Sequence, residues 1–242
     1  MQSNFTYSKA LGTGADVQAT SEYTPDDPFN LGTTYGYQNY DRKFVYNLFF
    51  VYQPPFYKGQ SGLMGRVLGG WSFASVFTAG SASPIEIYTS TGDGQEYGAG
   101  DNINYFGNEN AVQIAPIAHG HAYYNKPSGA LPVNMFQAGT AAISDFRNPI
   151  LGLDFKDGGN GNIFGLPYWN LDFSVRKNIV VAENFSLEFQ GVFANVLNHN
   201  QWQDPDFLTG LFGPSTFGAL PGSAEEQLGG IREVEVGARV RF

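Results

Sequence analysis

Apolar residues recur at every second position in six segments of this chain, less cleanly in 3–11 and 43–53, and this period limits its fold more than any other feature. The clearest case is residues 233–242, where Val234, Val236 and Val240 alternate with glutamate and arginine. A period of two residues sends successive side chains to opposite faces of a β-strand, whereas a helix needs a period near 3.6. The alternation predicts strands at about residues 3–11, 43–53, 70–88, 168–177, 185–198 and 232–242.

Short and long connections alternate between these expected strands. The connections 54–69 and 178–184 are short, whereas 12–42, 89–167 and 199–231 are long. Loops of more than about 15 residues are uncommon in compact domains. In a simple meander, this order brings every long loop to the same end of the sheet. Outer-membrane β-barrels have that asymmetry, with short periplasmic turns and long extracellular loops.

Composition excludes several classes of protein. Charged residues make up 14% of the chain and aromatic residues 16%, which does not suit a helical bundle or a disordered chain. A net charge of −9 argues against nucleic-acid binding. The chain has no cysteine, no run of about 20 apolar residues for a membrane-spanning helix, and no signal peptide at its first residues.

The sequence therefore predicts an all-β fold, an antiparallel meander of about six long strands forming part of a transmembrane β-barrel with long extracellular loops. A ten-residue strand rises about 34 Å and, tilted by about 45°, spans roughly 24 Å, which matches the apolar band of such barrels. The alternative is a soluble or cell-surface β-sandwich that binds a ligand with its long loops. A second sheet covering the apolar face would distinguish the sandwich from the barrel.

Metal and catalytic patterns are incomplete. His119 and His121 form an H-x-H pair that could hold zinc on one strand, but His199 is distant in sequence. Acidic residues at 93, 96 and 101 lie in a glycine-rich stretch that could bind calcium, although without EF-hand spacing. No nucleophile motif or phosphate-binding loop is present. We therefore expect neither an enzyme activity nor a cofactor.

Several stretches resemble TonB-dependent outer-membrane receptors. The segment GLPYWNLDFSVRKNIVVAENFSLEFQGVFANVLNHNQW is similar to the penultimate hairpin of these receptors, most closely in the Oar-like group that carries a carboxypeptidase-regulatory-like domain. Four upstream stretches match in the same order: NFTYSKALG, DPFNLG, YDRKFVYNLFFVYQPPF and GWSFASVFTAGSASPIEI. The final REVEVGARVRF resembles the closing strand. The resemblance covers nearly the whole chain except residues 90–135.

The resemblance implies a barrel of about 22 strands filled by a plug and located in the cell outer membrane. Residues 1–242 would be its C-terminal portion, without the plug and the N-terminal strands. The implied function is uptake of a bulky ligand, driven by an inner-membrane energy-coupling complex. The implied partners are outer-membrane lipid, the barrel-assembly machinery, the plug, the other strands and a ligand of unknown identity.

Two groups of residues are candidate sites in such a barrel. The closing strand carries an outward row and a terminal aromatic, which we expect the assembly machinery to recognise: Val236, Val240 and Phe242. The second group alternates with apolar residues and should line the lumen: Asp172, Arg176, Glu188, Glu235 and Arg239. This wall would contact the plug or substrate, or it would form a cross-strand charge ladder, which we favour.

Two further expectations concern local structure. The short turn before Phe185 predicts that Arg176 lies opposite Ser186 and Phe173 opposite Phe189, with Glu188 as a diagonal neighbour of Arg176. Residues 89–167 lack alternation and are rich in glycine and asparagine. We expect them to be the least regular and most mobile part, with short helical or strand pieces.

Overall fold

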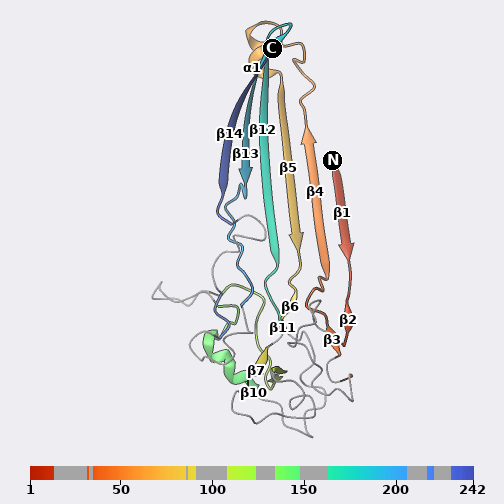
Figure 1. The fold of residues 1–242 in the computed structure, drawn as a ribbon, viewed down its shortest axis with the longest axis vertical. Coiled ribbons are helices and arrows are strands. Elements are labelled where there is room, and N and C mark those ends of the chain that lie inside the picture. The colour runs from red at the N-terminus through yellow and green to blue at the C-terminus, as the bar shows by residue number, and fades with distance from the viewer. Residues whose placement is uncertain are drawn as a thin grey trace.

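A single six-stranded antiparallel sheet dominates a computed structural model of the protein (Figure 1). The structure describes residues 1–13, 32, 35–85, 87–90, 108–123, 134–147, 163–205, 217–220 and 230–242. The sheet has the order β1-β4-β5-β12-β13-β14, so each long strand lies beside the next one along the chain. Its strands are β1 (Gln2–Tyr7), β4 (Phe44–Tyr52), β5 (Trp71–Gly80), β12 (Tyr168–Ala182), β13 (Phe185–Ala194) and β14 (Glu233–Arg241). The predicted antiparallel meander is confirmed.

Shorter elements complete the described part of the chain. One short helix, α1 (Gly62–Leu68), lies at the end of the sheet where β12 turns into β13 (Figure 1). The others are β2 (Leu11–Gly12), β3 (Gly36–Tyr37), β6 (Pro84–Ile85), β7 (Tyr88–Ser90), β8 (Asn108–Asn110), β9 (Val112–Gln113), the 3₁₀ helix η2 (Gly139–Asp145), β10 (Phe146–Arg147) and β11 (Ile163–Phe164). These short elements lie toward the opposite end of the sheet (Figure 1). The expected strand 70–88 is therefore broken into β5, β6 and β7.

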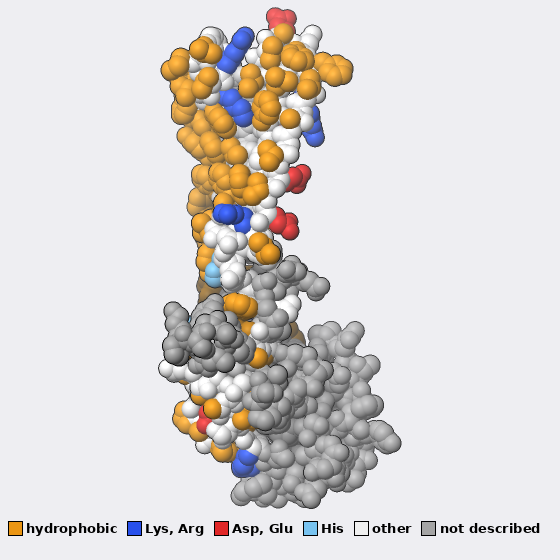
Figure 2. Space-filling model, turned by 90° about the vertical axis from the view of Figure 1, so that its left-hand side faces the viewer, with side chains coloured by type: hydrophobic (Ala, Val, Ile, Leu, Met, Phe, Trp, Pro, Cys, Tyr) orange, Lys and Arg blue, Asp and Glu red, His pale blue; other side chains and the backbone are white. Residues whose placement is uncertain are grey.

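The strand pairings give the sheet one apolar and one polar face. Phe173 lies opposite Ser75 on β5 and Phe193 on β13, and Phe193 lies opposite Val234 on β14. Because side chains alternate, the odd-numbered rows of β5, β12 and β13 share one face with the even-numbered row of β14. Viewed along the β14 edge, hydrophobic side chains cover one side of the sheet and acidic ones project from the other (Figure 2). Within the described residues no second sheet stacks on the apolar face, which contradicts the sandwich alternative.

The buried hydrophobic core lies outside the large sheet. It is built by the described residues of 84–166 together with 217–220, which we call the loop cap. Phe136 is fully buried, and its ring stacks on Phe217 with centroids 5.2 Å apart. Phe146 packs against the same pair of rings. The described parts of 89–167 contain the expected short strands and a 3₁₀ helix. They also hold most of this core, which the sequence did not indicate.

The register of the β12–β13 hairpin differs from the expected one. Arg176 lies opposite Gln190 rather than Ser186, and Phe173 lies opposite Phe193 rather than Phe189. β12 continues to Ala182 and only two residues separate it from β13, with a register shift between Val180 and Ala182. The expected strand ended too early because the run Ile179, Val180 and Val181 does not alternate. The shift is by an even number of residues, so each side chain keeps its predicted face.

The pairing of β12 with β5 ends at Lys177 opposite Trp71. The backbone groups of β12 beyond Lys177 therefore have no partner on β5. The side-chain amide of Gln60 takes the place of a strand residue there. The Val180 amide donates to Gln60 Oε1 at 2.9 Å, and Gln60 Nε2 donates to the Asn178 carbonyl at 2.9 Å. The Asn178 amide in turn donates to the carbonyl of Gly70 at 2.9 Å. The end of β12 is therefore closed by a turn from the neighbouring hairpin.

Replacing Gln60 should loosen this end of β12. In Gln60→Ala the Val180 amide and the Asn178 carbonyl lose their partners, and each lost hydrogen bond is worth about 1 kcal/mol. We expect a lower unfolding free energy in detergent micelles and faster amide exchange at Val180. Gln53→Ala, an exposed glutamine before the same turn, is the matched control. Equal exchange at Val180 in both variants would contradict the bracing role of Gln60.

Candidate functional site: the polar face of the sheet and its loop cap

Glu188 is the centre of a charge cluster on the polar face. Its side chain is 9% exposed and lies between two arginines, with Arg241 Nη2 at 3.0 Å and Arg176 Nε at 3.9 Å. Arg176 also donates to Gln190 Oε1 across the strand pair, at 3.5 Å. Arg176 and Glu188 are diagonal neighbours, as expected, although the observed register puts them together from the other side. The cluster links β12, β13 and β14.

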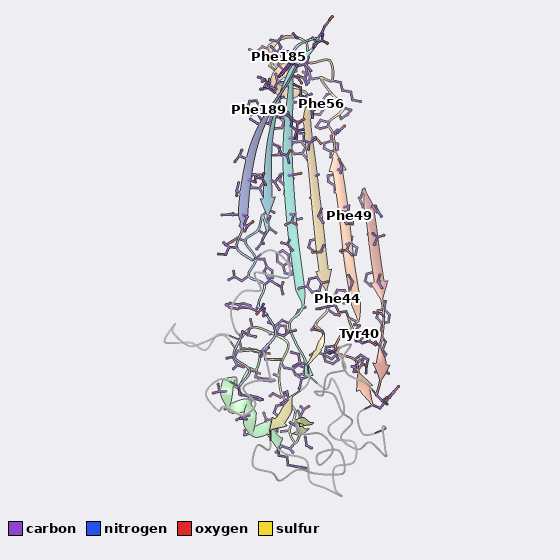
Figure 3. The ribbon with its side chains drawn as sticks, viewed as in Figure 1. Tyr40, Phe44, Phe49, Phe56, Phe185 and Phe189 are labelled. Atoms are coloured by element: carbon purple, nitrogen blue, oxygen red, sulfur yellow. The ribbon has the colours of Figure 1, made fainter. Side chains whose placement is uncertain are left out.

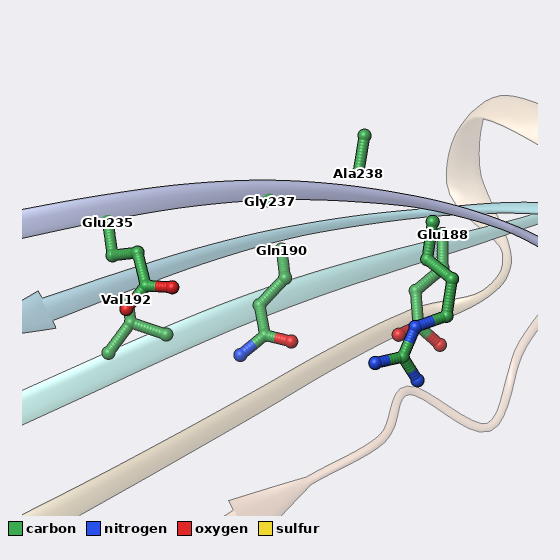
Figure 4. A pocket seen from close by; sticks show the side chains of 7 residues that line it. Glu188, Gln190, Val192, Glu235, Gly237 and Ala238 are labelled. Carbon is green, nitrogen blue, oxygen red and sulfur yellow. The ribbon is translucent and has the colours of Figure 1, made fainter.

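Two of the other predicted wall residues, Glu235 and Arg239, line an open hollow between β13 and β14 together with Glu188. The labelled side chains of Gln190, Glu188 and Glu235 project to the same side of the sheet (Figure 4). Asp172 is apart from them: its carboxylate accepts from Asn170 Nδ2 and from the Asn195 amide, both at 2.9 Å. Asp172 therefore secures the end of β13 and takes no part in the charge cluster.

Asn195, which the sequence analysis did not single out, ties this end of β13 to the start of β14. Its side-chain Nδ2 donates to the carbonyls of His199 and Gly230, at 2.8 and 2.6 Å. Its φ of 47° is left-handed, a conformation that asparagine tolerates better than most residues. The partners lie up to 35 residues away, so no local pattern could indicate this role.

The closing strand β14 is the outer edge of the sheet. Val236 and Val240 lie on the apolar face, and Val236 is 82% exposed. Phe242 follows the strand at the end near α1 and is fully exposed. The outer edges of β14 and β1 pair with no other strand in the described part of the chain. The sheet is therefore open at both edges.

The three histidines have separate surroundings. His119 lies within hydrogen-bond distance of the Ile117 carbonyl, and the ring of His121 meets Tyr123 edge-on. Gly120 between them has a φ of 83°, so the pair does not lie on a regular strand. His199 stacks on Trp169 at 4.0 Å, and burial lowers the pKa of its imidazole. Among the described residues no group of three metal ligands exists, and the calcium candidates at 93, 96 and 101 lie outside them.

A half-buried carboxylate, Asp204, lies between the end of β5 and the loop cap. Asp204 accepts from the Leu166 amide at 2.7 Å and from the Ser83 hydroxyl at 3.5 Å. Burial raises the pKa of Asp204 above its ordinary value, although the Leu166 amide, the nearby Arg42 charge and Ser83 act in the opposite direction. Arg42 also donates to the Ser81 carbonyl and lies over the Tyr168 ring. These partners are far apart in sequence, so no spacing could have predicted the cluster.

A sheet with one apolar face, one charged face and all its long connections at one end agrees with the match to a known family. The family model for an outer membrane beta barrel domain covers residues 1–235. The chain belongs to this outer-membrane β-barrel family. No curated protein and no solved structure matches the chain.

Membership of the outer-membrane β-barrel family places the protein in the outer membrane. The apolar face of such a barrel contacts lipid. Aromatic side chains lie at both ends of the sheet, with Phe185 and Phe56 near α1 and Tyr40 toward the loop cap (Figure 3). That distribution suits the two interfaces of a membrane. Among the described residues, no helix is long and apolar enough to cross a membrane.

Neutralising Glu188 should weaken the β12–β13–β14 unit of this barrel family member. Glu188→Gln keeps the size of the side chain but removes its attraction to Arg176 and Arg241. Because both arginines are about half exposed, the expected loss of unfolding free energy is only about 1 kcal/mol. Glu235→Gln is the control, since Glu235 makes no ion pair with any described residue. Denaturant unfolding in micelles measures both; equal losses would contradict the cluster.

The raised pKa of Asp204 predicts a pH dependence of stability. The folded state holds this proton more tightly than the unfolded state, so the contribution is fully present below pH 3.8 and is lost as the pH rises through the native pKa. Asp204→Asn should lack this fall, and Ser83→Ala, which retains the carboxyl, should keep it. Unfolding free energies measured across acidic to neutral pH test the difference. Parallel profiles for Asp204→Asn and the unmodified chain would refute the assignment.

Proposed function

We propose that the chain forms part of the barrel wall and the extracellular loops of a TonB-dependent receptor that takes up a bulky ligand. The observation that carries the proposal is the difference between the two ends of the sheet. One end has a two-residue turn and the short helix α1, and the other carries the loop cap with its own hydrophobic core. A passive wall does not need a packed cap, whereas capture of a ligand outside the membrane needs an ordered binding surface.

The polar face supports the same proposal. In a barrel it faces the lumen, where the exposed charges of Arg176, Glu235 and Arg239 are in contact with water. The ion pairs of Glu188 with Arg176 and Arg241 support the cross-strand ladder that we favour over a substrate contact. The wall would supply shape and electrostatic potential to the passing ligand, and no chemical step.

The open edges of β1 and β14 support a larger barrel. Unpaired backbone groups are costly in lipid, so closed barrels are the only sheets that span membranes. We propose that further strands and a plug complete the receptor. The assembly machinery would recognise the closing strand through Val236, Val240 and Phe242, and an inner-membrane complex would supply energy.

Energised import is the property that separates this proposal from a passive pore. Cells that produce the receptor are given fluorescently labelled solutes of increasing size, with and without a protonophore. We expect uptake of a bulky solute that disappears on deletion of the gene and on addition of the protonophore. Substitution of Phe136 by alanine, which removes a fully buried ring from the loop cap, should reduce this uptake.

The matched control for the cap is Ile114→Ala, because Ile114 lies on the same cap but is exposed. It should leave uptake unchanged. Uptake that is unaffected by the protonophore and falls steadily with solute size would indicate an open diffusion pore and contradict the receptor.

A further inference from the structure

The helix α1 carries its apolar side chains away from the rest of the protein. Leu63, Met64 and Val67 are 80%, 62% and 54% exposed. At spacings of three and four residues they share one side of the helix. A surface helix of a globular protein has the opposite arrangement, with its apolar stripe against the core. This apolar side of α1 is joined by exposed Phe56 in the preceding turn.

Glycines form the side of α1 that faces the protein. A side chain at Gly65 would meet the backbone of Gln60, and one at Gly69 would meet the Tyr57 carbonyl. A side chain at Gly70 would meet the Asn178 carbonyl of β12, and Gly70 has a φ of +72°. The helix therefore contacts the rest of the protein closely through its backbone, and its large apolar side chains lie on the outer side.

The helix is fastened to the apolar face of the sheet. Lys177 and Trp71 lie opposite each other and share that face with Phe173 and Phe73. Trp71 Nε1 donates to the Val67 carbonyl at 3.0 Å, and Lys177 Nζ donates to the same carbonyl at 2.9 Å and to the Gly69 carbonyl. The Lys177 ammonium also lies 4.9 Å from the centroid of the Trp71 ring. The last turn of α1 is thus held on the lipid-contacting side of the wall.

We propose that α1 is an interfacial anchor that inserts Leu63, Met64 and Val67 into the phospholipid leaflet at the short-turn end of the barrel. The exposed apolar surface of α1 continues the apolar face of the sheet, as the hydrophobic side chains at the top of Figure 2 show. Residues 53–70 contain Lys58 and Arg66 but no acidic residue, although the whole chain has a net charge of −9. That local charge suits lipid phosphates, as in other interfacial helices.

The proposal rests on membership of the outer-membrane family and is independent of the uptake function. The chain has no cysteine, so single cysteines can be introduced and spin-labelled. The full chain carrying Leu63→Cys or Val67→Cys is placed in vesicles of phosphatidylethanolamine and phosphatidylglycerol. The accessibility of each label to oxygen, which concentrates in lipid, is compared with its accessibility to a water-soluble nickel chelate.

Two control labels bracket the result. Ile114→Cys lies on the loop cap at 55% exposure, almost the same as Val67, and Phe189→Cys lies on the apolar face of the sheet. We expect the oxygen-to-nickel ratio at positions 63 and 67 to be several-fold above that at position 114 and close to that at position 189. A ratio equal to that at 114 would overturn the proposal, because α1 would then lie in water.

Loss of access to both reagents at positions 63 and 67 would also overturn it, since a protein surface would then cover the helix. If the label at position 189 were more accessible to the nickel chelate than to oxygen, the apolar face of the sheet would not contact lipid. That result would also overturn the proposal, because the proposal depends on this lipid contact. None of these readings depends on a ligand or on energy coupling, so failure of the anchor and failure of the uptake proposal are separable.

Discussion

The apolar face of the six-stranded sheet has no protein layer over it in the described part of the chain, and the other features of the fold follow from this. In a soluble domain such a face packs against a second sheet or against helices. Here lipid takes that place, and cohesion comes from the backbone ladder and from rings in neighbouring strands. Phe73, Phe173 and Phe193 form such a row across β5, β12 and β13, with centroid separations of 6.3 and 6.4 Å.

In lipid, the backbone N–H and C=O groups also need hydrogen-bond partners wherever one strand extends beyond its neighbour. β12 extends five residues beyond Lys177, where its pairing with β5 stops. Gln60 serves as a substitute strand residue for Val180 and Asn178, while Lys177 satisfies carbonyls at the end of α1. One compact turn thus closes both the strand and the helix, which explains why polar side chains such as Gln60 and Lys177 are buried beside an apolar face.

The parts of the fold that the sequence predicted are those that depend on the period of two. The six strands, their order and the side to which Asp172, Glu188 and Glu235 point all follow from alternation. The helix α1 was not predicted, because seven residues with apolar groups on the outside do not resemble a core-facing helix. The cap core was not predicted either, since Ile87, Phe136 and Phe217 come from distant short segments. The Asp204 cluster was missed for the same reason.

The register of the β12–β13 hairpin shows which property of a barrel wall is robust. The expected pairing was four residues out, yet Arg176 still contacts Glu188, and both still lie on the polar face. An even shift preserves the faces, and a long side chain reaches a diagonal neighbour on either side. An odd shift would have moved Phe173 and Val175 to the polar face. Apolar side chains would then be exposed to water, which is unfavourable. The face that a residue occupies is therefore determined by the whole apolar row, whereas its individual partner depends on a single turn. For this reason the sequence predicts the chemistry of the two faces more securely than any one contact across them.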